Sequence, residues 1–262
     1  MQRIIYTDLD GTLLDSETYS YMDAEHCLDI IKQKDIPLVF CTSKTRYEIL
    51  KFRKKVSNIH PFISENGGGI FIPKNYFDFN FDFDYDNEDY FVINLGSEYE
   101  KLIDVINELK QDFQIRSFID MSVDEISNDT NLNSEDSKLA KKREYEIPFK
   151  INDIKQEKEI IRRIKEKGLN CFIGGKFYHL MGDNDKGMAV ERLSELYKKK
   201  YGSIFTIGIG DSQNDFSMLN KVDRGYLVMK KSGEYASTDY NPAGDVGPKG
   251  WSKAIKKELA LS

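Results

Sequence analysis

The sequence predicts an α/β protein whose parallel sheet is interrupted by a separate α+β unit. Near both ends of the chain, short apolar segments rich in β-branched residues alternate with helical patterns, as in βαβ units. Between them, antiparallel strand signals are mixed with helices. We therefore expect one discontinuous core, residues 1–83 plus 185–262, and an inserted unit at 84–184, with hinges near residues 83 and 184.

The N-terminal part predicts a βαβαβ arrangement. Its apolar, β-branched runs are typical of buried parallel strands, and the apolar residues between them recur at helical spacing. A glycine-rich turn at 65–69 closes this part. The expected strands are 3–7, 36–41 and 61–64, and the expected helices are about 24–31 and 45–55.

Across the expected boundary, residues 77–86 alternate aromatic and polar, mostly acidic, residues, which predicts an amphipathic strand or ribbon with a solvated acidic face. Its acidic spacing resembles a calcium loop, but Asn87 and Ile93 stand where that loop needs Gly and Glu, so we exclude calcium. Residues 122–146 are polar, without a predicted element. Further expected strands are 90–95, 115–119, 148–151, 170–173 and 176–180, and the helices are 98–112 and 156–167.

The parallel pattern returns in the C-terminal part. A long helical segment precedes a buried strand that ends in Asp211-Ser212-Gln213-Asn214-Asp215. The expected elements are a helix at 186–201, a strand at 203–210, a short helix from 217, a strand at 225–229 and a closing helix at 249–259.

Composition excludes several classes of protein. The 262 residues carry a formal charge of -6, which disfavours a general nucleic-acid binder. No apolar run reaches the ~20 residues of a membrane helix, and the first residues lack a signal-peptide pattern. The three cysteines form no CxxC pair. We expect a cytoplasmic protein with no membrane or nucleic-acid partner; its oligomeric state stays open.

Polar clusters stand where the apolar strands end or where a helix begins. Open α/β sheets place their sites at these strand ends. Neighbouring carboxylates repel each other and so favour a bound cation, and hard oxygen ligands suit Mg²⁺. A lysine at a helix start favours phosphate. Each cluster alone has a plainer explanation as a turn, a cap or a solvated side chain. The residues are Asp8, Asp10, Thr42, Lys186, Asp211 and Asp215.

The order of these clusters resembles the haloacid dehalogenase (HAD) superfamily of phosphatases. Its four motifs match Asp8 with Asp10, Thr42, Lys186 and 210–215. The insertion resembles the α+β cap of the Cof-like branch. The resemblance implies a HAD-like Rossmannoid parallel-sheet core with an inserted α+β cap domain that selects the substrate.

Further segments resemble the mannosyl-3-phosphoglycerate phosphatase family. They are 40–46, 64–68, 139–145 and 174–182. Ile147 departs from this family, which usually carries an acid there, and the ribbon at 77–86 is a second departure. The resemblance implies Mg²⁺-dependent hydrolysis of a small phosphorylated sugar-glycerate, mannosyl-3-phosphoglycerate, to phosphate and mannosylglycerate, a compatible solute.

The same resemblance implies the role of each residue, including the choice of Asp8 over Asp10 as nucleophile, which spacing cannot make. Asp8 would form an aspartyl-phosphate and Asp10 would act as acid and base. The metal ligands would be Asp8, Asp10, Asp211 and Asp215, supported by Ser212 and Asn214. The phosphate would contact Thr42, Ser43 and Lys186, and the rest of the substrate Lys44, Asn66, Gly67, Lys142, Arg143 and His179.

Four alternatives stay open. The substrate could be glucosyl-3-phosphoglycerate, since one epimeric hydroxyl is hard to read from a sequence, or the chain could be a general Cof-type sugar phosphatase. A phosphomutase would usually carry a smaller cap. A non-catalytic aspartyl-phosphate switch also has strand-end Asp, Thr and Lys, but such domains lack the inserted unit.

Overall fold

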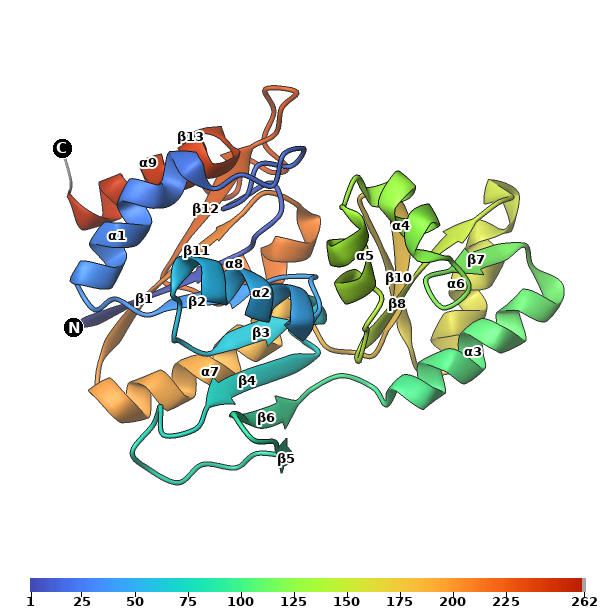
Figure 1. Ribbon diagram of the computed structural model, residues 1–262, viewed down its shortest axis with the longest axis horizontal. Helices are drawn as coiled ribbons and strands as arrows, with labels where there is room; N and C mark the ends of the chain where they lie inside the picture. The colour runs from blue at the N-terminus through green and yellow to red at the C-terminus, as the bar shows by residue number, and fades with distance from the viewer. Residues whose placement is uncertain (261–262) are drawn as a thin grey trace.

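The computed structural model describes residues 1–260, which form two lobes joined by two chain connections (Figure 1). The core lobe, residues 1–94 and 186–260, contains a nine-stranded sheet. The cap lobe, residues 99–181, contains a four-stranded sheet. Both connections, 95–98 and 182–185, run along the same side of the boundary between the lobes (Figure 1).

The sheet of the core lobe is parallel over most of its width. Its strands are β1 (Gln2–Thr7), β2 (Leu38–Cys41), β3 (Phe62–Ser64), β4 (Gly69–Pro73), β5 (Tyr85–Asp86), β6 (Tyr90–Asn94), β11 (Ile204–Gly210), β12 (Arg224–Met229) and β13 (Asn241–Val246). The order is β13-β12-β11-β1-β2-β3-β4-β6-β5. All pairs from β13 to β3 are parallel, and those from β3 to β5 are antiparallel. Because β1 and β11 are parallel neighbours, the residues that follow them meet at one sheet edge.

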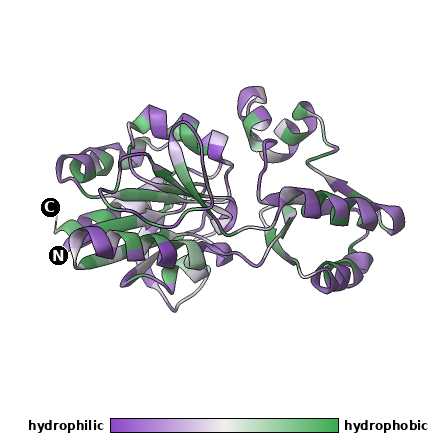
Figure 2. Cartoon of the chain, turned by 90° about the horizontal axis from the view of Figure 1, so that it is seen from below, coloured by the Kyte–Doolittle hydropathy of each residue, from purple (hydrophilic) through white to green (hydrophobic). Residues whose placement is uncertain are grey.

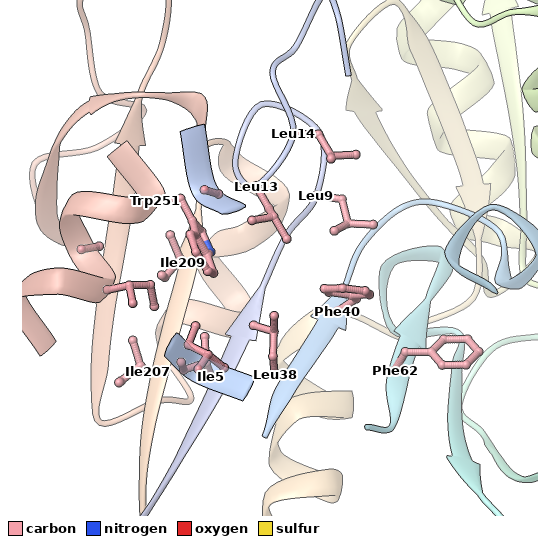
Figure 3. Close-up of a cluster of buried hydrophobic side chains, with 14 of the residues drawn as sticks. Ile5, Leu9, Leu13, Leu14, Leu38, Phe40, Phe62, Ile207, Ile209 and Trp251 are labelled. Atoms are coloured by element: carbon pink, nitrogen blue, oxygen red, sulfur yellow. The ribbon is translucent and has the colours of Figure 1, made fainter. Parts of the chain in front are cut away.

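Helices cover both faces of this sheet. One face carries α1 (Glu25–Gln33), α2 (Arg46–Val56) and α9 (Gly247–Leu259), and the other carries α7 (Lys186–Tyr201) and α8 (Phe216–Leu219). Alternate residues of β1 explain this: Ile5 packs in the cluster with Trp251 (Figure 3), whereas Ile4 joins Val190 of α7. Figure 2 shows hydrophobic strands enclosed by helices with hydrophilic outer faces.

The cap lobe is an antiparallel sheet between two pairs of helices. Its strands are β7 (Ile115–Ser117), β8 (Glu146–Ile151), β9 (Asn170–Gly174) and β10 (Phe177–Met181), in the order β7-β8-β10-β9. One face packs on α3 (Tyr99–Asp112) and α6 (Glu157–Glu166), and a smaller cluster joins the other face to α4 (Val123–Thr130) and α5 (Ser134–Ala140). The second face therefore stays partly free toward the core lobe.

The expected boundary at residue 83 differs from the strand pairing. Strands β5 and β6 continue the large sheet beside β4, so this sheet extends to Asn94. The expected strand over 77–86 is also wrong, because only Tyr85–Asp86 is a strand. Aromatic contacts explain the difference: the rings of Phe77, Phe79 and Phe81 pack on one another, and Phe77 packs on Tyr197 of α7, without a ladder of backbone hydrogen bonds.

Four strands and helices went unpredicted: β4, which directly follows the expected turn at 65–69, and α4, α5 and β13. Helices α4 and α5 lie within the polar segment 122–146, where few apolar residues reveal a helical period. Their starts carry local signals: Ser122 forms a capping box with Glu125, and Asn133 caps α5. Strand β13 contains Pro and Gly and lies at the sheet edge, where both are tolerated.

No helix within residues 1–260 combines the length and the apolar composition that crossing a membrane requires.

Candidate active site

A cavity of about 530 Å³ lies between the lobes, at the carboxyl ends of β1, β2 and β11. Its lining combines carboxylates and lysines of the core lobe with cations and aromatic rings of the cap lobe. The main polar and aromatic residues are Asp8, Asp10, Lys44, Arg143, Phe172, Lys176, Phe177, His179 and Asp211. The structure therefore gathers residues from distant parts of the sequence around one space.

Asp8 and Lys186 form the buried centre of the core side. The Lys186 Nζ lies 2.7 Å from Asp8 Oδ1 and 2.6 Å from Asp215 Oδ1. Asp185 caps α7 by accepting the N–H of Met188, and this cap fixes the turn that carries Lys186. Burial raises the pKa of Asp8 to about 7, although the Lys186 ammonium pulls it down. The two carboxylates raise the pKa of Lys186 against the effect of burial, so Lys186 stays charged.

A third carboxylate, Asp211, lies beside this pair. Single oxygens of Asp8, Asp211 and Asp215 lie within 4.8 Å of one another. The second oxygen of Asp215 accepts the backbone N–H groups of Asp211 and Ser212, at 2.9 and 3.1 Å, so Asp215 organises the loop. Burial and the neighbouring carboxylates Asp215 and Asp8 raise the pKa of Asp211 to about 8. Such a concentration of negative charge favours a bound cation.

Asp10 faces the same cavity from the turn after β1. Its Oδ2 lies 2.8 Å from the Nζ of Lys44, which also lies 3.4 Å from Glu48. Its Oδ1 is buried and has no hydrogen-bond partner among residues 1–260. Within residues 1–260, Asp10 therefore has one oxygen paired with Lys44 and one left unpaired.

The residues predicted to bind phosphate lie at different depths from the cavity. Ser43 lines the cavity, as does its neighbour Lys44, which was predicted to contact the rest of the substrate. Thr42 lies fully buried behind them, and its Oγ1 accepts the N–H of Lys44 at 3.4 Å. The Ser43 carbonyl accepts a hydrogen bond from Arg143 of the cap lobe at 2.7 Å. The loop after β2 therefore contacts both lobes.

Asn66 and Gly67, which the sequence predicted to contact substrate, lie behind the cavity lining. The Asn66 Oδ1 accepts a hydrogen bond from Asn214 at 3.1 Å, and Asn214 accepts one from Ser212 at 2.7 Å. Gly67 has φ +91°, and a Cβ there would lie 2.0 Å from the carbonyl oxygen of Asp185. Gly67 therefore lets the turn approach the start of α7, and both residues shape the site rather than line it.

In the cap lobe, Arg143 and His179 line the cavity and share a carboxylate that sequence reasoning missed. The Arg143 Nη1 donates to Glu146 Oε1 at 2.5 Å, and the His179 Nδ1 lies 3.0 Å from the same oxygen. Glu146 is fully buried. Burial alone would raise its pKa, but His179 and Arg143 hold the pKa of Glu146 below its ordinary value. No pattern marked Glu146, because it opens an otherwise apolar strand segment.

Lys142 does not reach the cavity. It is exposed, and its Nζ lies 4.8 Å from the centre of the Tyr47 ring on the outer surface. The backbone turn after α5 directs Arg143 inward and its neighbour outward, and the sequence alone gave no reason to separate them. The prediction that Lys142 binds substrate is therefore not supported by its position.

Tyr19, Lys176 and Lys230 are among the cavity residues that sequence reasoning missed. Tyr19 of the core lobe donates from its hydroxyl to the Thr130 carbonyl of the cap lobe at 3.0 Å. Lys176, at the end of the Gly174-Gly175 turn, donates to the carbonyl of Asp129 at 3.0 Å. Lys230 lines the core side and makes no salt bridge within the described chain. A basic residue directly after a hairpin turn could have marked Lys176.

Comparison with known proteins matches residues 5–235 to the model of a family described as haloacid dehalogenase-like hydrolase. A glucosyl-3-phosphoglycerate/mannosyl-3-phosphoglycerate phosphatase of Methanococcoides burtonii is 44% identical, covering 97% of this chain and 96% of its own. A mannosyl-3-phosphoglycerate phosphatase of Pyrococcus furiosus is 36% identical, covering 87% and 91%. A crystal structure from Thermoplasma acidophilum superposes with a TM-score of 0.71 at 22% identity, over 100% of both chains. These matches extend across both lobes.

Proposed function

Because the chain belongs to the haloacid dehalogenase-like hydrolase family, we propose that it hydrolyses mannosyl-3-phosphoglycerate to mannosylglycerate and phosphate. The observation that carries this proposal is the 44% identity to a named phosphatase over 97% of the chain, which includes the cap lobe. That relative is named for the glucosyl substrate as well, so glucosyl-3-phosphoglycerate is the second candidate.

The charges of the cavity support an anionic substrate with two charged ends. Lys186 lies beside Asp8 at the buried end, where a phosphoryl group would react. Arg143, Lys176 and Lys230 lie farther along the lining and offer partners for a glycerate carboxylate. The ring of Phe172 offers an apolar face to a sugar. We therefore assign phosphoryl chemistry to the core lobe and substrate selection to the cap lobe.

The acidic cluster fits Mg²⁺. Single carboxylate oxygens of Asp8, Asp211 and Asp215 lie within 4.8 Å of one another, and Asp10 lines the cavity beside them, so this edge of the sheet offers hard oxygen donors. Both oxygens of Asp215 are already engaged, so it supports the loop and the neighbouring ligands. When bound, Mg²⁺ would neutralise charge on the phosphoryl oxygens.

The side chains divide the reaction into two steps. An oxygen of Asp8 attacks phosphorus, the bond from phosphorus to the glycerate oxygen breaks, and Asp10 gives its proton to that oxygen. A water molecule then attacks the phosphorus of the aspartyl-phosphate, Asp10 takes the water proton, and Asp8 is released with phosphate. Lys186 stabilises the negative charge that spreads over the phosphoryl oxygens. Ser43, which lines the cavity, supplies a further donor near the phosphate.

We place this reaction in the cytoplasm. The three cysteines, Cys27, Cys41 and Cys171, are free thiols, which is compatible with a reducing compartment. The only partner that the proposed reaction needs is the small phosphorylated substrate.

The test is phosphate release from mannosyl- and glucosyl-3-phosphoglycerate beside a panel of simple sugar phosphates, each with Mg²⁺ and with excess chelator. We expect kcat/KM for the two glycosyl-phosphoglycerates to exceed that of the panel by about 100-fold or more, and turnover to stop when the metal is removed. Broad, weak activity across the panel would leave a general sugar phosphatase. An aspartyl-phosphate that forms without turnover would indicate a switch.

A further inference from the structure

The carboxylate of Glu146 joins two cavity residues of the cap lobe to the core lobe. It is fully buried at the first position of β8. One oxygen binds Arg143 at 2.5 Å and His179 at 3.0 Å. The other accepts a hydrogen bond from the Nδ2 of Asn66, a core residue, at 2.8 Å. All three partners therefore depend on one charged group.

Glu146 fixes the orientation of the His179 ring. A carboxylate only accepts hydrogen bonds, so the Nδ1 of His179 carries a proton. The ring stacks on Phe172 with 4.7 Å between centroids and 12° between planes. Its Nε2 is then directed toward Gly174, where a Cβ would lie only 2.9 Å away. The glycine and the carboxylate together hold one ring nitrogen at the cavity wall.

Glu146 also holds Arg143, with help from two backbone carbonyls. The guanidinium donates to Ala140 from Nε at 2.8 Å and to Ser43 from Nη1 at 2.7 Å. Its Nη2 makes no hydrogen bond within residues 1–260. Because the planar guanidinium has a fixed geometry, these contacts determine the direction of the remaining N–H groups.

The Asn66 contact extends this network toward the acidic cluster. Asn66 accepts a hydrogen bond from Asn214, two positions after Ser212 in the loop that carries Asp211. Its backbone carbonyl accepts one from Asn184, in the connection between the lobes, at 3.3 Å. The network is complete only while the cap lobe rests on the core lobe.

A buried carboxylate is costly to desolvate, and well-packed apolar residues often stabilise a fold as well as a buried ion pair does. Stability alone therefore does not explain Glu146. We infer that Glu146 is a positioning residue, which sets Arg143 and His179 in the orientation that binds the glycosyl-glycerate part of the substrate. This inference rests on the proposed function and deepens it.

The test is the change of Glu146→Gln, which keeps the size of the side chain but removes its charge and one acceptor. We expect KM for glycosyl-3-phosphoglycerate to rise about tenfold or more, with kcat within about threefold of its original value. Glu144→Gln is the matched control, because Glu144 pairs with Arg46 outside the cavity. Its KM should stay within about twofold.

A double variant separates positioning from a general structural effect. Because Glu146 acts through His179 as well as Arg143, Glu146→Gln should raise KM by a clearly smaller factor in a His179→Gln background than in the unmodified protein. His179→Gln alone, which leaves Glu146 paired with Arg143 and Asn66, should raise KM even if Glu146→Gln fails to fold.

Two outcomes would overturn the inference. One is a KM in Glu146→Gln equal to that of Glu144→Gln, and the other is a double variant whose effects simply multiply. If the unmodified enzyme hydrolyses glycosyl-3-phosphoglycerates, either result would leave the proposed function intact. Failure of the unmodified enzyme to hydrolyse them would instead overturn the proposed function.

Discussion

The two lobes bring polar residues together in different ways. In the core lobe, Lys186 lies within 2.7 Å of both Asp8 and Asp215, which come from distant parts of the chain, because parallel strands β1 and β11 end side by side. In the cap lobe, Arg143 and His179 meet through Glu146, which also needs Asn66 of the core lobe. Sheet topology therefore fixes the reacting groups, whereas packing between lobes fixes the recognition groups.

The largest expected effect is the loss of turnover in a variant that still recognises the substrate. Asp8→Asn should lower kcat at least about 10⁴-fold for every phosphate ester, because an amide cannot form the aspartyl-phosphate. Steady-state phosphate release measures it. Asp89→Asn, an exposed carboxylate of the core lobe, is the control. Turnover of Asp8→Asn at the original rate would end the assignment of Asp8 as nucleophile.

The next comparison is between the stability costs of replacing one glycine in each lobe. Gly67 and Gly175 both have positive φ, +91° and +58°, but only Gly67 abuts backbone, with a Cβ position 2.0 Å from the Asp185 carbonyl. Gly67→Ala should lower the free energy of unfolding by about 2 kcal/mol more than Gly175→Ala, whose cost is about 1 kcal/mol of left-handed strain. Urea denaturation measures both. Equal losses would show that the turn around Gly67 can move away from the start of α7 without lowering the free energy of unfolding.

A change in the cap lobe should alter recognition more than chemistry. Arg143→Ala should raise KM for mannosyl-3-phosphoglycerate about tenfold or more, and far less for a small aryl phosphate. Lys142→Ala, one position away and directed outward over Tyr47, should leave both KM values within about twofold. Equal effects of Arg143→Ala on the two substrates would contradict a recognition role.

The smallest effect concerns acid stability of the core lobe. Burial lowers the pKa of His60 to about 4, and its Nδ1 lies 2.7 Å from the hydroxyl of Tyr76. In the unfolded chain, His60 binds a proton near pH 6.5. The stability that the buried neutral ring contributes is therefore complete above that pH and is lost as pH falls toward 4. Between pH 7.5 and 5.5 we expect a loss of about 1 kcal/mol. 

Urea denaturation at the two pH values measures this loss. His60→Gln should remove that part of the pH dependence, and His26→Gln, which changes an exposed histidine of α1, should retain it. An unchanged pH dependence in His60→Gln would contradict this account of acid stability.

The core site could largely be predicted from the sequence, because its residues follow recognisable strands. Asp8 and Asp211 come directly after β1 and β11, Asp10 follows Asp8 by two residues, and the parallel pairing of the two strands brings them to one sheet edge. The sheet edge was harder, since the aromatic alternation at 77–86 reflects burial against α7 rather than strand pairing.

The cap site could be predicted only in part. Arg143 and His179 do line the cavity, but nothing in the sequence separated Arg143 from Lys142, because a single backbone turn decides which one points inward. Glu146 gave no signal, since its burial depends on three partners from both lobes. Contacts between distant segments leave no periodic trace in the sequence.

If the core lobe carries out the reaction and the cap lobe recognises the substrate, calorimetric titration of Asp8→Asn will separate the two roles. With Mg²⁺ present, this variant should bind mannosyl- or glucosyl-3-phosphoglycerate with a Kd within about tenfold of the KM of the unmodified protein, and an aryl phosphate about 100-fold more weakly. Equal affinity for the glycosyl-phosphoglycerate and the aryl phosphate would contradict this division of roles, because the cap lobe would then contribute nothing to recognition.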